Sequence, residues 1–381
     1  MSGRIGTAIG LGALLVAGPL SFAEIGWASD GTMSAGVATG TDSNVFLSKN
    51  DSRSSTFLQT TFNAGWETAP TPAQRLSLTS QGFYKHYFRF GEADQIFADA
   101  IVAYRYALTR SLLLGLIPST SYNQLQLLDT EGNVLPRDHF IAYNSEVRGY
   151  LQVLPNRVSR LTFAGGVRRT DVRETTDAPS SIDPSVVITF PSLDNHGYFA
   201  TAESGVRNGS GKADLSYEYA VTHYEETQAN NRDTSLTGTR LATNPLLVLV
   251  QHTARLRLGQ ILTSWVSVTA EGQMRWNVDP FEGDLTYRQM DGKLQGALDL
   301  WRLARWTTSI AYRTRIYAEQ VDDSGASDRR ERFLTLTSSL QRQWTGHLSS
   351  NLQYQVVRKT SNVSLDQFAV RIFSISLDFI L

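Results

Sequence analysis

Two pairs of arginines, each spaced two residues apart, are the strongest candidates for contacting a charged ligand. Arg255 and Arg257 form one pair, and Arg313 and Arg315 form the other. Alternate residues of a β-strand point to the same side of a sheet, so an extended chain would turn each pair into a short row of positive charge. Such rows attract anions, either small acids or an acidic sugar polymer.

The same alternation places other charged side chains on one face of their predicted strands. The cations on this face are Lys85, Arg89, Arg105, Arg148, Arg168, Arg207, Arg255, Arg257, Arg275, Lys293, Arg313 and Arg315, and the acids are Asp99, Glu146, Glu203, Asp214, Glu218, Glu271, Asp291, Asp299 and Glu319. Cations slightly outnumber acids, which favours a path for anions. Alternatively, opposite charges pair across strands and hold a packed, nonconducting interior. Because the cross-strand register is not fixed by one sequence, both interpretations stay open.

Catalytic and metal-binding patterns are missing from the sequence. The histidines are His86, His139, His196, His223, His252 and His347. None stands beside a G-x-S-x-G turn, and no H-E-x-x-H spacing occurs. There is also no cysteine, which excludes thiolate metal sites and disulfides. We therefore expect neither an enzyme nor a cofactor.

Alternating apolar and polar residues run through most of the chain. Between Ile141 and Val153, for example, Tyr143, Val147 and Leu151 fall on one face and charged or amide residues on the other. This pattern predicts an all-β protein. The predicted strands are 33–41, 56–68, 75–90, 95–108, 112–127, 140–154, 158–174, 198–208, 213–226, 246–261, 265–278, 285–303, 306–321, 332–344, 348–359 and 367–381. The count is about sixteen, with about 14 to 18 possible.

The connections between these strands alternate in length. Tight links at 109–110, 155–157 and 345–347 alternate with long ones such as 128–139 and 322–331. Short turns at one end and longer loops at the other are typical of an up-and-down antiparallel transmembrane β-barrel of bacterial outer membranes.

The C-terminal segment supports the same fold. Its last residues, 373–381, alternate between apolar residues and Ser374, Ser376 and Asp378, and the apolar face continues to Leu381. The final strand of an outer-membrane barrel faces lipid on one side and closes the sheet against the first strand. Tryptophans near the predicted strand ends fit the aromatic girdles of such barrels: Trp66, Trp265, Trp276, Trp301, Trp306 and Trp344.

The N-terminal segment predicts export from the cytoplasm. Arg4 precedes an apolar run up to Leu20, and Ser21-Phe22-Ala23 fits a signal-peptidase site. We assign residues 1–23 to a signal peptide, 24–32 to a short periplasmic segment and 33–381 to the barrel. Expected partners are outer-membrane lipids and the barrel-assembly machinery. The net charge of −1 argues against nucleic acid binding.

The longest predicted loop, 175–197, contains Pro179, Pro184 and Pro191 and the apolar stretch 186–190. Long loops in compact folds tend to be functional. An inward or lid-like position is favoured, with a hairpin above the barrel or a docking surface as alternatives.

One short segment carries a family resemblance. The residues Thr39 to Phe46 (TGTDSNVF) follow the first predicted strand. With Asp42, Ser43, Asn44 and Phe46, this segment resembles the start of the mature domain in a Gram-negative outer-membrane β-barrel porin family. Several members of that family are encoded with exopolysaccharide secretion machinery. The resemblance implies an outer-membrane barrel with exopolysaccharide and periplasmic secretion components as partners. Thr41 stands where an aromatic residue is common in the family, and the chain lacks the helical repeats of self-sufficient secretins.

The function expected from these observations is an outer-membrane pore of a Gram-negative bacterium for exopolysaccharide export. A general or anion-preferring diffusion porin is one alternative. A nonconducting scaffold or adhesion barrel is another.

Overall fold

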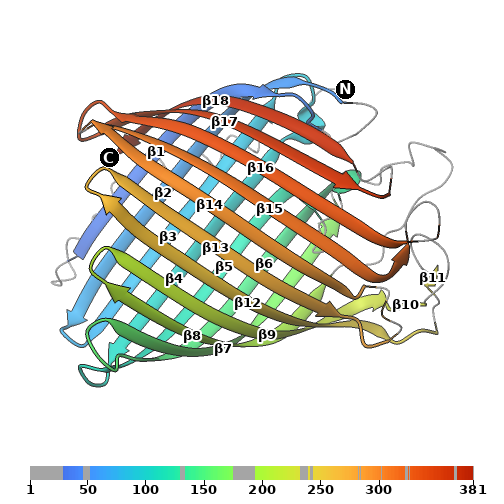
Figure 1. Cartoon of the computed structure of the whole chain (residues 1–381), viewed down its shortest axis with the longest axis horizontal. Coiled ribbons are helices and arrows are strands. Elements are labelled where there is room, and N and C mark those ends of the chain that lie inside the picture. Colours follow the sequence, from blue (N-terminus) through green and yellow to red (C-terminus); the bar gives the residue numbers. More distant parts are fainter. Residues whose placement is uncertain are drawn as a thin grey trace, which may run out of the picture.

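The chain forms one closed antiparallel β-barrel (Figure 1). The computed structural model describes residues 29–45, 52–128, 134–174, 194–231, 239–240, 243–281, 283, 285–301, 303–321, 325, 327–363 and 367–380. In these ranges no helix is long and apolar enough to cross a bilayer. The predicted signal peptide and the loop residues 175–193 lie outside them.

Sixteen strands make up the barrel, and two short ones form a separate sheet. The barrel strands are β1 (Ser29–Asp42), β2 (Ser55–Thr71), β3 (Gln74–Tyr87), β4 (Gln95–Ala107), β5 (Leu112–Leu128), β6 (Val134–Val153), β7 (Ser159–Glu174), β8 (Asn195–Asn208), β9 (Gly211–Gln228), β12 (Leu246–Thr263), β13 (Val266–Val278), β14 (Tyr287–Trp301), β15 (Ala304–Val321), β16 (Asp328–Gln343), β17 (Leu348–Ser361) and β18 (Phe368–Ile380). The small sheet pairs β10 (Asn230–Asn231) with β11 (Thr239–Arg240), and a 3-10 turn, η1 (Gly91–Ala93), follows β3. The predicted fold class and strand count are confirmed.

The last strand closes the barrel against the first, as predicted from the C-terminal alternation. β18 pairs with β1 from Ser34↔Ile380 to Asp42↔Ile372, and every other barrel strand pairs with its neighbours in chain order. In this arrangement the described barrel has no free sheet edge, so its backbone donors and acceptors are satisfied between strands.

Several strands are longer than predicted at the end where the long loops lie. β6 begins at Val134 rather than at 140, and β16 begins at Asp328 rather than at 332. At the opposite end, β1 starts at Ser29 rather than at 33, so it includes residues that the sequence assigns to the N-terminal segment. Backbone hydrogen bonds continue the ladder wherever a neighbouring strand is present, whether the side chains are apolar or polar. The predictions stopped where the apolar alternation stopped.

The two ends of the barrel differ. Links such as 109–111 and 345–347 are short, and they gather at the left of Figure 1. β18 finishes there too, with the Ile380 amide donating to the His347 carbonyl at 2.8 Å. We call this the turn end. The opposite end, where the longer connections lie, is the loop end.

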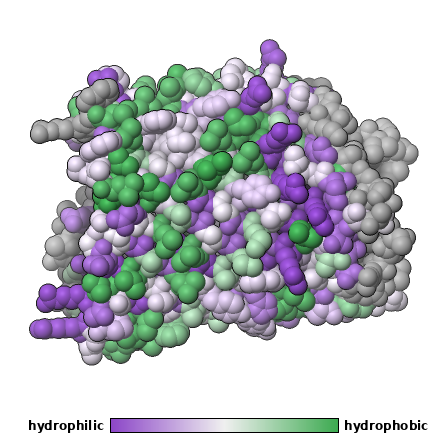
Figure 2. Space-filling model, in the orientation of Figure 1, coloured by the Kyte–Doolittle hydropathy of each residue, from purple (hydrophilic) through white to green (hydrophobic). Residues whose placement is uncertain are grey.

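The barrel is apolar outside and polar inside, the reverse of a soluble protein. Large apolar side chains project from the outer face, including Phe163 at 53% exposed and Val167 at 60%. The fully or nearly buried side chains instead include Glu331, Lys359 and Arg315. Figure 2 shows apolar residues across the middle of one outer face, with hydrophilic residues toward both ends. An apolar outer surface of this extent suits lipid rather than water.

A glycine inside the barrel predicts a clear stability effect. A Cβ on Gly166 of β7 would stand 2.2 Å from the Val147 carbonyl oxygen and 2.8 Å from the Phe199 ring. We expect Gly166→Val to lower the free energy of unfolding by about 1–3 kcal/mol, because the backbone oxygen cannot move aside. Unfolding in urea, followed by tryptophan fluorescence, measures this. Gly149→Val is the matched control, since nothing lies within 4 Å of a Cβ there.

Candidate functional site in the barrel lumen

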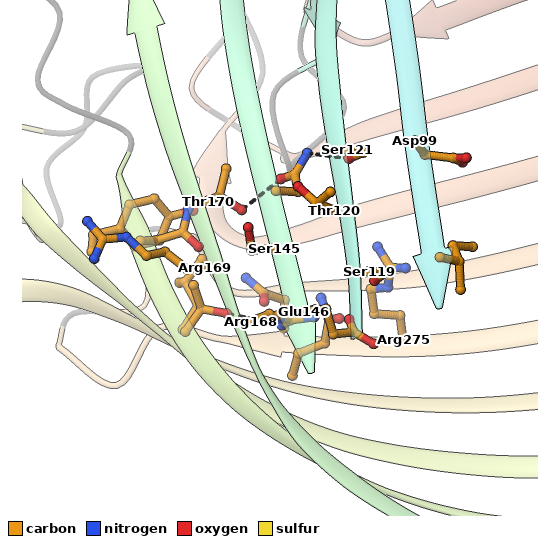
Figure 3. A pocket seen from close by; sticks show the side chains of 18 of the residues that line it. Asp99, Ser119, Thr120, Ser121, Ser145, Glu146, Arg168, Arg169, Thr170 and Arg275 are labelled. Carbon is orange, nitrogen blue, oxygen red and sulfur yellow. Dashed lines mark hydrogen bonds between the residues drawn. The ribbon is translucent and has the colours of Figure 1, made fainter. Parts of the chain in front are cut away.

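A cavity of about 590 Å³ lies inside the loop half of the barrel (Figure 3). Strands from β4 to β9 and from β12 to β14 contribute to its wall. Residues far apart in the sequence therefore meet in one space, for example Asp99, Glu146 and Arg275. Most of the residues that line it carry hydroxyl, amide or charged groups, and the aromatic rings of Phe97, Tyr224 and Tyr287 also contribute.

Three charged side chains face one part of this cavity. Glu146 of β6 and Arg168 of β7 are direct register partners, and Arg275 reaches the cavity from β13. Arg168 donates to the Thr222 hydroxyl at 3.1 Å. No carboxylate among the described residues lies within ion-pair distance of Arg168 or Arg275, and the Nε of Arg275 is buried without a hydrogen-bond partner. Two guanidinium groups are thus available to an anionic ligand.

Hydroxyl and amide groups form a network beside these charges. The amide of Asn144 donates to the Ser121 hydroxyl at 3.2 Å and accepts from the Thr170 hydroxyl at 2.9 Å, as Figure 3 shows. The network joins β5, β6 and β7 across one wall. Neutral donors and acceptors of this kind hydrogen-bond sugar hydroxyls, and the nearby aromatic rings offer apolar contact.

A second cavity, of about 720 Å³, is lined by residues of β1, β3, β4 and β12–β18. Lys85, Arg255, Glu271, Lys293 and Arg313 line it. Opposite charges pair here, as the second interpretation of the sequence expected. Arg313 contacts Asp291, and Arg255 and Arg257 lie 3.4 and 3.8 Å from Glu271.

Near the loop end, a buried cluster surrounds one carboxylate. Glu331 is 0% exposed and lies 2.7 Å from Arg329, 3.3 Å from Lys359 and 4.0 Å from Arg315. Arg315 also donates two hydrogen bonds to the side-chain amide oxygen of Gln289 and one to the Tyr317 hydroxyl. Among the described residues, these three cations thus contact the same carboxylate, in a region shielded from water.

The remaining candidate residues are not gathered into these sites. Arg105 lies opposite Arg75 in the ladder of β3 and β4, and Arg207 lies opposite Lys212 beside a tight turn. Glu218 faces Thr201 and Thr253, and Arg148 of β6 has a buried Nε without a partner.

The assignment of Arg89 to a strand face is wrong. β3 ends at Tyr87, and Arg89 is exposed in the turn that follows, where its amide donates to the Ser55 hydroxyl. The alternation of side chains between two faces holds only within a strand, so it does not predict the direction of the Arg89 side chain.

Sequence reasoning missed several charged residues inside the barrel, and four of them form close ion pairs. Arg160 of β7 bridges Glu203 at 2.6 Å and Asp214 at 2.9 Å across two neighbouring strands. Arg329, Glu331 and Lys359 form the buried cluster. Two of these, Arg329 and Glu331, fall in the predicted loop 322–331. The alternation of β16, continued toward Asp328, would have found them, since Phe333 and Glu331 share a face.

The residues that carry the family resemblance hold the closure of the barrel together. The carboxylate of Asp42 accepts from the Asn44 amide at 3.0 Å and from the Tyr87 hydroxyl at 3.1 Å. Ser43 exchanges hydrogen bonds with the Arg371 backbone, and the side-chain amide of Asn44 donates to the Ala369 carbonyl. These contacts connect β1, β3 and β18. Phe46 lies outside the described residues.

Removing the Asp42 carboxylate tests this structural role. We expect Asp42→Ala to reduce the free energy of unfolding by about 1–3 kcal/mol, since buried donors of Asn44 and Tyr87 lose their acceptor. Asp30→Ala, at the exposed opposite end of β1, serves as the control and should change stability little. Equal effects of the two substitutions, measured by denaturant titration, would contradict the role.

Two histidines expected in loops lie in strands. His139 belongs to β6, and His196 belongs to β8, where its ring stacks on His223 with centroids 5.5 Å apart. Residues 195–197 of the predicted long loop likewise form the start of β8. The predicted inward or lid-like position of this loop stays a prediction, because its residues 175–193 lie outside the described ranges.

A scan against protein-family models and a search of the curated proteins each find no match to this sequence. Solved structures do match. CdiB from Escherichia coli aligns with a TM-score of 0.54 at 11% identity, over 91% of this chain and 63% of that chain. OccAB1 from Acinetobacter baumannii aligns with a TM-score of 0.49 at 10% identity, over 93% and 96% of the two chains. A bacterial polysaccharide outer membrane secretin aligns with a TM-score of 0.44 at 10% identity, over 92% and 97%.

The likeness to CdiB extends to the barrel fold alone, since the identity is 11% and this chain spans less than two thirds of that protein. Evidence on function therefore has to come from the lumen and from the outer face.

Proposed function

We propose that this chain is an outer-membrane pore of a Gram-negative bacterium, and that its cargo is an exopolysaccharide. The observation that carries the proposal is the polar cavity enclosed by an apolar-faced closed barrel. Polar interior and apolar exterior together suit a hydrophilic solute crossing lipid. The proposal assigns no catalytic step to the chain.

The wall of the first cavity supports a carbohydrate cargo. It offers neutral hydroxyl and amide groups such as Ser121, Asn144 and Thr170, with aromatic rings close by. These groups form exchangeable hydrogen bonds to sugar hydroxyls, and Arg168 and Arg275 would contact an acidic substituent on the polymer. Weak, repeated contacts suit passage because a conducted solute must leave as readily as it enters.

A second candidate is an anion-preferring diffusion porin. Arg168 and Arg275 favour it, because neither pairs with a described carboxylate. Passage of small anions depends on these two arginines and not on the hydroxyl network around Asn144. A porin and a polysaccharide exporter therefore predict different substrates.

Conductance in planar bilayers tests whether the chain is a pore. Folded protein should insert and give discrete conductance steps, and a soluble oligosaccharide of the exported polymer should block them in a concentration-dependent way. Absence of steps from protein shown to be folded would refute a pore of either kind. Steps blocked only by small anions would favour the porin.

Gene deletion tests the cargo in cells. Export predicts loss of secreted polysaccharide on deletion and its recovery on complementation. Unchanged polysaccharide with slower uptake of small anions would contradict export. The proposal also assigns periplasmic secretion components as partners, so the complemented strain should yield them in crosslinking experiments.

A further inference from the structure

Five exposed arginines lie on the outer face of the barrel near its loop end. They stand on β14, β16, β17 and β18: Arg288, Arg330, Arg332, Arg358 and Arg371. Figure 2 shows a band of hydrophilic side chains on this face, beside the loop end and next to the apolar area. We call these five residues the outer arginine row.

The register makes the row continuous. Arg332 pairs with Thr360 while its neighbour Leu334 pairs with Arg358, so Arg332 and Arg358 are diagonal neighbours. Arg358 pairs with Ala369 and Val356 pairs with Arg371, which repeats the diagonal on the next strand pair. Diagonal neighbours in a sheet lie about 7–8 Å apart.

The row extends to β14 on its other side. Arg288 and Arg330 both face Ile316, one from each neighbouring strand. Trp276 pairs directly with Arg288. An aromatic residue at this level is typical of the interface between lipid tails and headgroups.

The charge of the row is not balanced by the protein. Among the described residues, no carboxylate lies within ion-pair distance of any of the five. The acid nearest to them on the outward face of β16 is Asp328, the first residue of the strand. Elsewhere on the outer face the pattern differs, since Arg169 of β7 lies 2.8 Å from Asp171 and 3.8 Å from Glu225. An anion from outside the chain is therefore the natural counter-charge.

The position of the row along the barrel axis, relative to the apolar outer belt, identifies the source of that anion. On β16 the outward residues between Arg332 and Arg342 include Leu334, Leu336 and Leu340, each about two-fifths exposed. A tilted strand of about 10 residues crosses the apolar layer of a bilayer. Arg332 and Arg342 therefore stand at opposite interfaces, and the row lies among the headgroups on the loop side.

We propose that the outer arginine row binds the phosphate groups of a phosphorylated lipid in the leaflet at the loop end. The inference rests on the membrane location given under the proposed function. Guanidinium groups bind phosphate through two parallel hydrogen bonds, and the spacing of the row suits a headgroup that carries two phosphates. Sitting at an interface, the arginines incur little of the cost that a charge meets at the bilayer centre.

Native mass spectrometry of the folded full chain in detergent tests the proposal, with bis-phosphorylated lipid A as the probe. Wild type should retain the lipid, and Arg332→Gln/Arg358→Gln/Arg371→Gln should bind it on the order of a hundredfold more weakly, about fivefold for each arginine. Dephosphorylated lipid A should bind wild type as weakly as the triple variant binds the intact lipid. Excess inorganic phosphate should not displace the lipid.

Arg342→Gln is the matched control, since Arg342 is exposed on the same face of β16 at the turn end, above the Trp344 ring. It should bind within about twofold of wild type. The single variant Arg358→Gln supplies the test if the triple variant does not fold.

Equal binding by wild type and the triple variant, or equal loss in Arg342→Gln, would overturn the site, as would displacement by free phosphate. Conductance of the same variants separates this result from the proposed function. The row lies outside the lumen, so a triple variant that conducts normally but loses the lipid supports the site alone. Wild type that binds the lipid without conducting would refute only the pore.

Discussion

Glu331→Gln is expected to lower the free energy of unfolding by about 3–5 kcal/mol, because it removes the one buried negative charge that three neighbouring cations contact. Glu331 is fully buried and is the carboxylate that Arg315, Arg329 and Lys359 share. Glutamine keeps the shape and one oxygen but removes the negative charge. Denaturant unfolding in lipid vesicles, followed by tryptophan fluorescence, measures the change.

Two further variants show whether charge is the cause. Glu67→Gln breaks an exposed pair with Arg75, both side chains being more than half exposed, and should cost less than about 1 kcal/mol. Adding Lys359→Met to Glu331→Gln should recover part of the lost stability, because one unpaired buried cation is removed. A Glu331→Gln protein as stable as wild type would show that the cluster does not hold the loop end together.

Arg168→Glu/Arg275→Glu is expected to turn the ion preference of the pore toward cations. Each replacement puts a negative charge where a positive one faced the first cavity, beside Glu146. One unit charge at about 4 Å in water changes the energy of an ion by about 1 kcal/mol, or about fivefold in its local concentration. The ratio of K⁺ to Cl⁻ permeability should therefore rise by at least about fivefold. The reversal potential across a KCl gradient in planar bilayers measures this ratio.

Arg342→Glu is the control for this experiment, because Arg342 is on the outer face and should leave the reversal potential unchanged. A double variant with wild-type selectivity would place the narrowest charged part of the path elsewhere. The second cavity, with Lys293 and Arg313, would then be the next candidate.

The proposed lipid site and the lumen cavity use the same residue type on opposite faces. Arg168 is inward and Arg332 is outward, and alternation along each strand decides which. One pair of variants can therefore separate solute passage from lipid binding in a single protein.

The sequence by itself determined the fold class, the number of strands, the closure of β18 on β1 and the face of most mid-strand residues. The physical reason is local: side chains alternate with a period of two, and lipid outside and polar groups inside impose opposite requirements on the two faces. Tertiary structure alone decided which charges meet. Glu146 and Arg275 are far apart in the chain yet line one cavity, and Glu331 pairs with Lys359 of the next strand. It also decided where polar strands end, as at Arg89 and Asp328, and that the outer arginines form a row. Register and strand length depend on hydrogen bonds to neighbouring strands, which no local pattern contains.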